Sequence, residues 1–250
     1  MAVNRLGAFL IHLGISLLIF AVLAGVIRFV WYPDFFFAAD GGWQGIRIVA
    51  AVDLVLGPLL TLIVFDRRKP ELRRDLTMIG AFQLSCLIAG THVVYDQRPL
   101  ALVYVDGRFY SMSTDSYLKS DQPLPDFEHF DGPRPKRLIV KLPEDMDAQS
   151  DIRGSALRTQ TPLRMLADLY AEYDYSALNA DVEAYTSEEL LIQDQESQQL
   201  PGWLAVHGGT LEDYAFFPFA TRYHYVFLGI RRDAGTIVGL LNTPASALVR

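Results

Sequence analysis

The stretch IRIVAAVDLVLGPLLTLIVF at residues 46–65 runs directly into DRRKPELRRD at residues 66–75, and this contrast decides the fold. The first stretch is long and apolar enough to cross the hydrocarbon core of a bilayer, which takes about 20 helical residues. The second is short and strongly basic. Similar apolar stretches lie on both sides, at residues 9–31 and 76–95. We therefore expect three transmembrane helices over 9–31, 46–65 and 76–95.

The basic residues of the 66–75 loop predict the orientation of the chain. Cytoplasmic loops carry an excess of Lys and Arg, and this loop holds Arg67, Arg68, Lys69, Arg73 and Arg74. The loop at 33–45 holds no basic residue but has Asp34 and Asp40. The pattern favours a multi-pass protein of the bacterial inner membrane, with a cytoplasmic N-terminus and with all residues after the third helix in the periplasm.

Composition divides the chain into two parts. Hydrophobic residues make up 51% of the chain and its mean hydropathy is +0.18. Residues 1–95 hold six acidic and eight basic residues, whereas residues 96–250 hold 23 and 14, a net charge of about −9. An acidic domain repels phosphate and argues against a nucleic-acid partner. We expect a three-span transmembrane domain at 1–98 and a periplasmic α+β domain at 99–250.

Asp53 is the residue that stands out within the apolar stretches. An ionised carboxylate inside a bilayer costs about 2.5–3.5 kcal/mol on insertion scales, so Asp53 is expected to have a polar partner or to be protonated. Arg28 and His92 lie near the outer ends of the first and third helices, at a depth that allows all three side chains to meet. Two interpretations stay open: an Arg28–Asp53 pair that fixes the bundle, or an Asp53 that receives a polar group from a partner helix.

Gly57 and Pro58 follow Asp53 by one helical turn. Proline removes a backbone hydrogen bond, so this span is expected to kink and to free carbonyl groups that need new partners. His12, Gln83 and Ser85 are the other polar side chains that we single out within the spans, and polar contacts between helices explain them most simply.

The rest of the chain predicts an α+β domain with one antiparallel sheet. Asp106-Gly107 is a preferred two-residue turn between alternating strands, which indicates a hairpin over 100–112. Further strands are expected at 138–142, 214–219, 222–231 and 236–241, and an exposed loop at 122–135. Thr161-Pro162 has the residues of a helix start, and a second helix is expected near 187–195.

Catalysis finds little support in the sequence. His129, His207 and His224 are scattered, and no serine-hydrolase, P-loop or zinc-protease motif is present. The single cysteine, Cys86, allows neither an intrachain disulfide nor a cysteine zinc site. We expect no enzyme activity, no catalytic or metal-binding residues and no cofactor.

Three motifs carry a family resemblance. Trp31-Tyr32-Pro33, Asp40-Gly41-Gly42-Trp43 and VDLVLGPLLTLIVF at 52–65 occur in this order before a third apolar stretch. Their combination and spacing resemble the TfpX/TfpZ type IV pilin accessory proteins. The similarity is clearest over residues 9–105, and beyond it lies in the general plan and in RRDAGTIVG at 231–239.

The resemblance implies an inner-membrane accessory protein that binds a type IV major pilin and modulates pilus assembly or pilin stability, with membrane lipids around its helices. On this interpretation Asp53, Gly57, Pro58, Arg28 and His92 are the candidate partner-binding residues. A periplasmic sensor and a membrane enzyme of the cell envelope are the alternatives. A sensor finds little support in the short cytoplasmic loop, and an enzyme would need an acid, a base and a nucleophile near the outer surface.

Overall fold

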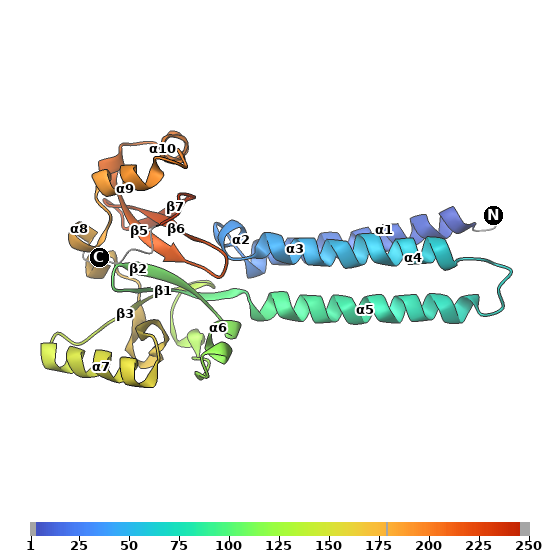
Figure 1. Cartoon of the computed structure of the whole chain (residues 1–250), viewed down its shortest axis with the longest axis horizontal. Helices are drawn as coiled ribbons and strands as arrows, with labels where there is room; N and C mark the ends of the chain where they lie inside the picture. The colour runs from blue at the N-terminus through green and yellow to red at the C-terminus, as the bar shows by residue number, and fades with distance from the viewer. Residues whose placement is uncertain (1–3, 179, 246–250) are drawn as a thin grey trace. The chain divides into compact units, whose positions relative to one another are not determined.

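The computed structural model of the protein describes residues 4–178 and 180–245. It divides into two compact units, Met1–Arg98 and Pro99–Arg250, and each builds its own set of contacts. The first unit is helical and the second is built around a sheet (Figure 1).

The helical unit contains three long helical segments that run side by side (Figure 1). The first begins at Arg5, the second at Gly42 and the third at Leu72. The first two are each interrupted or ended by a π-helical turn. The elements are α1 (Arg5–Val26), η1 (Ile27–Trp31), α2 (Phe36–Ala39), α3 (Gly42–Ala50), η2 (Ala51–Leu56), α4 (Gly57–Val64) and α5 (Leu72–Asp96).

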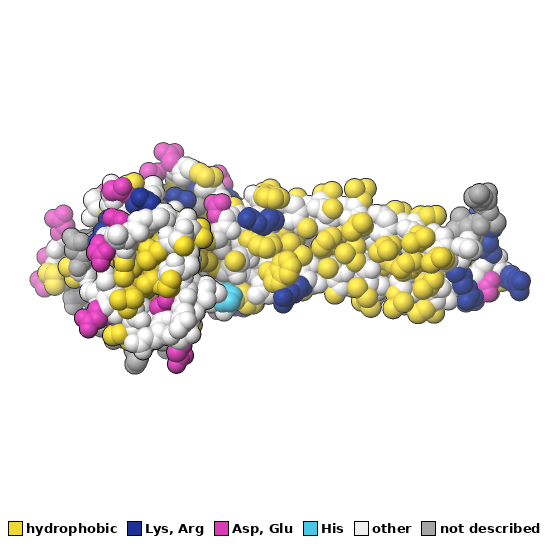
Figure 2. Space-filling view, turned by 90° about the horizontal axis from the view of Figure 1, so that it is seen from above, with side chains coloured by type: hydrophobic (Ala, Val, Ile, Leu, Met, Phe, Trp, Pro, Cys, Tyr) yellow, Lys and Arg dark blue, Asp and Glu magenta, His cyan; other side chains and the backbone are white. Residues whose placement is uncertain are grey.

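All three segments are long and apolar enough to cross a membrane. Arg5–Trp31, Gly42–Val64 and Leu72–Asp96 have mean hydropathies of 2.6, 2.1 and 1.5 over their most apolar windows. Figure 2 shows hydrophobic side chains along the length of this unit, and Lys and Arg at the end where the 66–75 loop joins the second span to the third. The chain is therefore a membrane protein with three spans, as predicted, and part of the expected 33–45 loop is helical instead.

Near the end of the helical unit that holds α2, the spans share a small apolar core. Ile27, Val49 and Val94 are buried there, one from each span. The Tyr32 hydroxyl donates to the carbonyl of Val94 at 2.9 Å, and Trp31 packs edge-on against Tyr95. The first and third spans are thus tied together where they end.

The second unit is built on one seven-stranded sheet with the order β4-β3-β1-β2-β5-β6-β7. The strands are β1 (Pro99–Val105), β2 (Arg108–Ser113), β3 (Lys136–Val140), β4 (Tyr170–Glu172), β5 (Tyr214–Ala220), β6 (Tyr225–Arg231) and β7 (Thr236–Leu241). The α+β class is confirmed. The sheet is mixed rather than purely antiparallel, because β1 pairs with β3 and β2 pairs with β5 in parallel.

Helices and short turns cover the sheet. They are α6 (Thr114–Lys119), η3 (Phe127–His129), α7 (Met146–Thr159), η4 (Leu163–Met165), η5 (Ala167–Leu169), η6 (Tyr175–Leu178), α8 (Ala180–Glu183), α9 (Ser187–Asp194), α10 (Leu200–His207) and η7 (Leu211–Asp213). One core joins β1–β3 to Tyr117, Phe127 and Met165. A second joins β5–β7 to the helices α9 and α10 through Leu190, Leu200 and Trp203.

The predicted helix at Thr161-Pro162 is wrong. Residues 163–169 form two 3₁₀ turns, and Tyr170 begins the short strand β4. The helix here is α7, which ends at Thr159 with Gln160 in the left-handed conformation, so Thr161 and Pro162 follow a helix rather than start one. The helix expected near 187–195 is confirmed as α9, capped by Thr186 and Glu189.

Candidate functional site

Five polar side chains from all three spans meet inside the helical unit. His12 and Ser16 come from α1, Asp53 and Thr61 from the second span, and Gln83 from α5. We call these five residues the polar cluster. Ser16, Asp53, Thr61 and Gln83 are buried, with Asp53 and Ser16 each only 1% exposed. Because polar groups inside a membrane need internal partners, such a cluster fixes how the three helices pack.

Gln83 is the centre of the polar cluster. Its side-chain Nε2 donates to Asp53 Oδ1, to the backbone carbonyl of Asp53 at 3.3 Å, and to Ser16 Oγ at 3.2 Å. A carbonyl can only accept, so the amide nitrogen must face Asp53 and Oε1 must face His12. His12 Nε2 lies 2.8 Å from that Oε1 and therefore donates to it.

The ring of His12 links Gln83 to the second span. Its Nδ1 lies 2.5 Å from Thr61 Oγ1. With Nε2 donating to Gln83, a neutral ring accepts the Thr61 hydroxyl proton at Nδ1. One continuous line of hydrogen bonds thus connects Thr61, His12, Gln83 and Asp53.

The bond to the Asp53 carbonyl has its origin in the sequence. In the π-helical turn Ala51–Leu56, the N–H of Gly57 bonds to the carbonyl of Val52, five residues earlier. The next bond in this register would join the N–H of residue 58 to the carbonyl of Asp53, and Pro58 has no N–H. The Gln83 amide donates to the Asp53 carbonyl instead. Pro58 was expected to free a carbonyl that needs a new partner, and this is such a carbonyl.

Gly57 gives the Gln83 side chain room to reach this position. A methyl group added at Gly57 would overlap the amide of Gln83, whose Nε2 lies 2.7 Å from the ideal Cβ site. Asp53, Gly57 and Pro58 are therefore parts of one arrangement: the carboxylate, the space for its amide partner, and the missing donor.

One acceptor of the polar cluster has no donor among the described residues. Asp53 Oδ1 accepts from Ser16 Oγ at 3.4 Å and from Gln83, whereas the buried Oδ2 has no hydrogen-bond partner. Both partners of the carboxyl group are uncharged. An unmatched buried oxygen carries a desolvation cost of about 1–3 kcal/mol, so this position favours an additional hydrogen-bond donor.

Arg28 and His92 lie outside the polar cluster. The guanidinium of Arg28 stacks over the rings of Phe29 and Phe37 at 5.4 and 5.2 Å. His92 Nε2 lies 3.3 Å from Asp96 Oδ2, and 73% of its side chain is exposed. The structure therefore does not bring Arg28, Asp53 and His92 together. The predicted Arg28–Asp53 ion pair is wrong, because neutral Ser16 and Gln83 bond to the carboxyl group in place of the arginine.

Ser16 and Thr61 are members of the polar cluster that the sequence did not single out. A signal was present in both cases. Ser16 follows His12 by four residues, and Asp53, Gly57 and Thr61 are spaced by four, so each set lies along one face of its helix.

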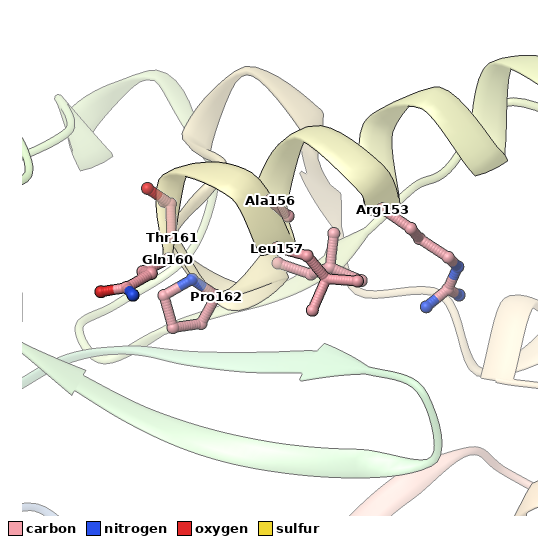
Figure 3. A pocket seen from close by; sticks show the side chains of 7 residues that line it. Arg153, Ala156, Leu157, Gln160, Thr161 and Pro162 are labelled. Carbon is pink, nitrogen blue, oxygen red and sulfur yellow. The ribbon is translucent and has the colours of Figure 1, made fainter.

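The second unit, Pro99–Arg250, which we call the soluble unit, has a surface hollow at the C-terminal end of α7 (Figure 3). It has a volume of about 480 Å³, and its apolar wall includes Ala156, Leu157 and Pro162. Arg153 lies at one end, where its guanidinium forms a two-pronged bond to Asp106 at 2.7 and 2.8 Å. This hollow lacks a nucleophile paired with a base. Among residues 4–178 and 180–245, no group of three or more His, Cys, Asp or Glu side chains is placed to hold a metal ion.

Comparison with known proteins identifies relatives. Residues 2–36 match the family model described as fimbrial assembly protein FimB. The serogroup I fimbrial assembly protein of Dichelobacter nodosus is 36% identical over 124 residues, which is 48% of each chain, and its serogroup E1 counterpart is 33% identical over the same length and shares. The chain thus spans about half the length of these relatives.

A shorter relative is covered more fully. The fimbrial assembly protein of Dichelobacter nodosus serogroups C1 and C2 is 38% identical over 96 residues, which is 38% of this chain and 73% of the relative. No solved structure matches the chain. The identity and coverage show that the chain belongs to the fimbrial assembly protein (FimB) family.

Proposed function

We propose that this chain is an inner-membrane accessory protein of the TfpX/TfpZ type, which binds a type IV major pilin and modulates pilus assembly or pilin stability. The observation that carries the proposal is the 38% identity with a fimbrial assembly protein over 73% of that protein's length. The match to the FimB model at residues 2–36 falls on the first span, so the shared feature includes a membrane helix.

The proposed mode of action is binding within the membrane. A pilin that awaits assembly is held in the membrane by one apolar helix. Helices associate in lipid through close packing and polar contacts, with about 1–2 kcal/mol for a polar contact in model peptides. The polar cluster sets the packing of the three spans, and Asp53, Gly57 and Pro58 thereby shape the surface that the pilin helix meets, while Arg28 and His92 lie nearer its outer end.

The proposal places the soluble unit in the periplasm, on the same side as the pilin globular head. The five basic residues of the 66–75 loop support this orientation. The acidic soluble domain then contacts the pilin head, and lipids surround the spans. In this role the protein acts by binding, without enzyme chemistry, cofactor or nucleic acid.

Recovery of pilin with the tagged protein tests the proposal. The protein is purified in mild detergent from membranes that contain the pilin, and the pilin in the eluate is measured by mass spectrometry. We expect pilin with the wild-type protein, and about 5- to 30-fold less with Asp53→Leu, the range that a loss of 1–2 kcal/mol produces.

Asp66→Asn is the matched control, since Asp66 is a partly exposed loop carboxylate that pairs with Arg5 at 3.3 Å. It should leave pilin recovery unchanged. Wild-type protein that recovers no pilin, together with normal surface piliation after deletion of the gene, contradicts the proposed function. Normal recovery with Asp53→Leu at normal protein levels contradicts the role of Asp53 alone.

A further inference from the structure

An apolar groove opens on the lipid side of the helical unit, between α1 and α5. It has a volume of about 690 Å³. Leu18 and Val22 of α1 line one wall, and Leu87 and Ile88 of α5 line the other. All of its lining residues belong to the first and third spans.

The outer end of the groove is closed by aromatic side chains. Trp31 and Tyr95 meet edge-on with ring centroids 5.2 Å apart. Trp and Tyr favour the boundary between hydrocarbon and headgroups, so the groove extends from this boundary into the apolar part of the membrane. An occupant therefore enters it sideways from the bilayer.

The groove also presents a polar group that lipid does not satisfy. Thr91 lines it, and the hydroxyl of Thr91 has no hydrogen-bond partner among the described residues. Thr77 and Ser85, on the same helix, each donate to the carbonyl four residues earlier, at 2.9 Å. An acyl chain has no hydrogen-bonding atoms, whereas a neighbouring helix supplies carbonyl oxygens and polar side chains.

We infer that the groove between α1 and α5 is the docking site for the single transmembrane helix of the partner protein. The inference rests on the proposed function for the identity of that partner, a pilin. Three observations converge on this occupant. The groove is apolar along its length, Thr91 and His92 supply polar groups near its outer end, and its α1 wall is the segment that matches the fimbrial assembly family. Asp53, which is buried, shapes the bundle rather than contacting the partner directly.

Site-specific photo-crosslinking distinguishes a helix from lipid in the groove. A benzophenone amino acid is placed at Val22, which lines the groove, or at Val55, which does not. The two valines have nearly equal exposed fractions, 60% and 56%, so they form a matched pair. In cells that produce the pilin, we expect a pilin adduct at Val22 and at least ten-fold less at Val55.

A substitution of Thr91 provides the second readout. Thr91→Val removes the unpartnered hydroxyl with little change of shape, and we expect about three- to ten-fold less pilin adduct at Val22. Thr77→Val is the control, because the Thr77 hydroxyl is already bonded within its own helix, and it should leave the yield unchanged.

The outcomes separate the groove from the proposed function. If pilin co-purifies with the protein but gives equal adducts at both valines, or none at Val22, the groove is not the docking site, while the proposed function still stands. An adduct at Val22 that contains only lipid or a second copy of this chain also contradicts the assignment of the groove as the docking site. Failure of the wild-type protein to recover pilin overturns both.

Discussion

At the scale of single residues, Gln83 explains most of the helical unit. One amide satisfies a carboxylate, a serine hydroxyl, a histidine and the carbonyl that Pro58 leaves without a donor. The sequence predicted a need for partners at Asp53 and next to Pro58. It did not predict that one side chain from α5 meets both needs, because this depends on the rotation of α5 against the second span.

Gln83→Leu tests this role. The change removes these hydrogen bonds while keeping a side chain of similar size, so we expect a loss of about 2 kcal/mol in the free energy of unfolding. The midpoint of thermal unfolding in detergent should fall by several degrees. Ser85→Ala, which removes a hydroxyl bonded within its own helix, should change the midpoint little. Equal losses in both variants would contradict the central role of Gln83.

Gly57→Ala should act through the same amide. Its methyl group overlaps Gln83, so the amide must leave its place. We therefore expect the double variant Gly57→Ala/Gln83→Leu to lose less stability than the sum of the single variants, because residues in contact are not additive. The double-mutant cycle in detergent measures this. Strict additivity would show that Gly57 acts elsewhere.

Asp194 provides the pH-dependent test in the soluble unit. Burial disfavours its charge, but hydrogen bonds from Ser197, Thr243 and the backbone N–H groups of Leu200 and Gln199 outweigh burial and lower its pKa. A carboxyl whose pKa is lower in the folded state stabilises the fold above its unfolded pKa of about 3.9, and this contribution is lost as the pH falls.

Asp194→Asn should therefore lower the free energy of unfolding at pH 7 by about 1–3 kcal/mol. The difference from wild type should shrink as the pH falls below about 4, because the carboxyl of the unfolded chain takes up a proton there, whereas the native carboxyl, with its lowered pKa, does so only at still lower pH. Chemical denaturation at both pH values measures it. Asp151→Asn, on the exposed face of α7, should change stability at neither pH. A difference that grows on acidification would contradict the assignment.

At the scale of elements, sequence patterns predicted secondary structure correctly where neighbouring residues alone determine it. Asp106-Gly107 makes the expected turn, with positive φ at both residues, and β1 and β2 flank it. The helix α7 escaped prediction because none of its side chains is buried, so it lacks an apolar stripe. Thr161-Pro162 has the residues of a helix start, but burial of Met165 against the sheet holds the next residues in 3₁₀ turns.

The contact between α10 and β6 gives a test at this scale. A methyl group added at Gly229 of β6 would lie 2.6 Å from Trp203 Cζ2, whereas one added at Gly202 of α10 meets nothing within 4 Å. Gly229→Ala should lower the free energy of unfolding by about 1–3 kcal/mol. Gly202→Ala should raise it by up to about 1 kcal/mol, because alanine favours a helix. Denaturant unfolding compares these two variants, and effects of the same sign would contradict the packing.

At the scale of the whole molecule, the three spans could be predicted from the sequence, whereas the strand pairing of the mixed sheet could not. Hydrophobic length alone predicts the spans, since a bilayer sets how many apolar residues each needs. The parallel pairs β1–β3 and β2–β5 join strands that are distant along the chain. No local pattern encodes such a pairing, which is why the sheet was expected to be antiparallel throughout.

The orientation in the membrane is the property on which the proposed function depends most, and labelling of single cysteines tests it. In a Cys86→Ser background, Leu124→Cys lies on an exposed part of the soluble unit and Lys69→Cys lies in the basic loop. Translocating five basic residues is costly, so this loop should stay in the cytoplasm. A membrane-impermeant maleimide should label Leu124→Cys in intact spheroplasts, and Lys69→Cys only after permeabilisation. The reverse pattern would put the soluble unit in the cytoplasm, where it has no access to a pilin head.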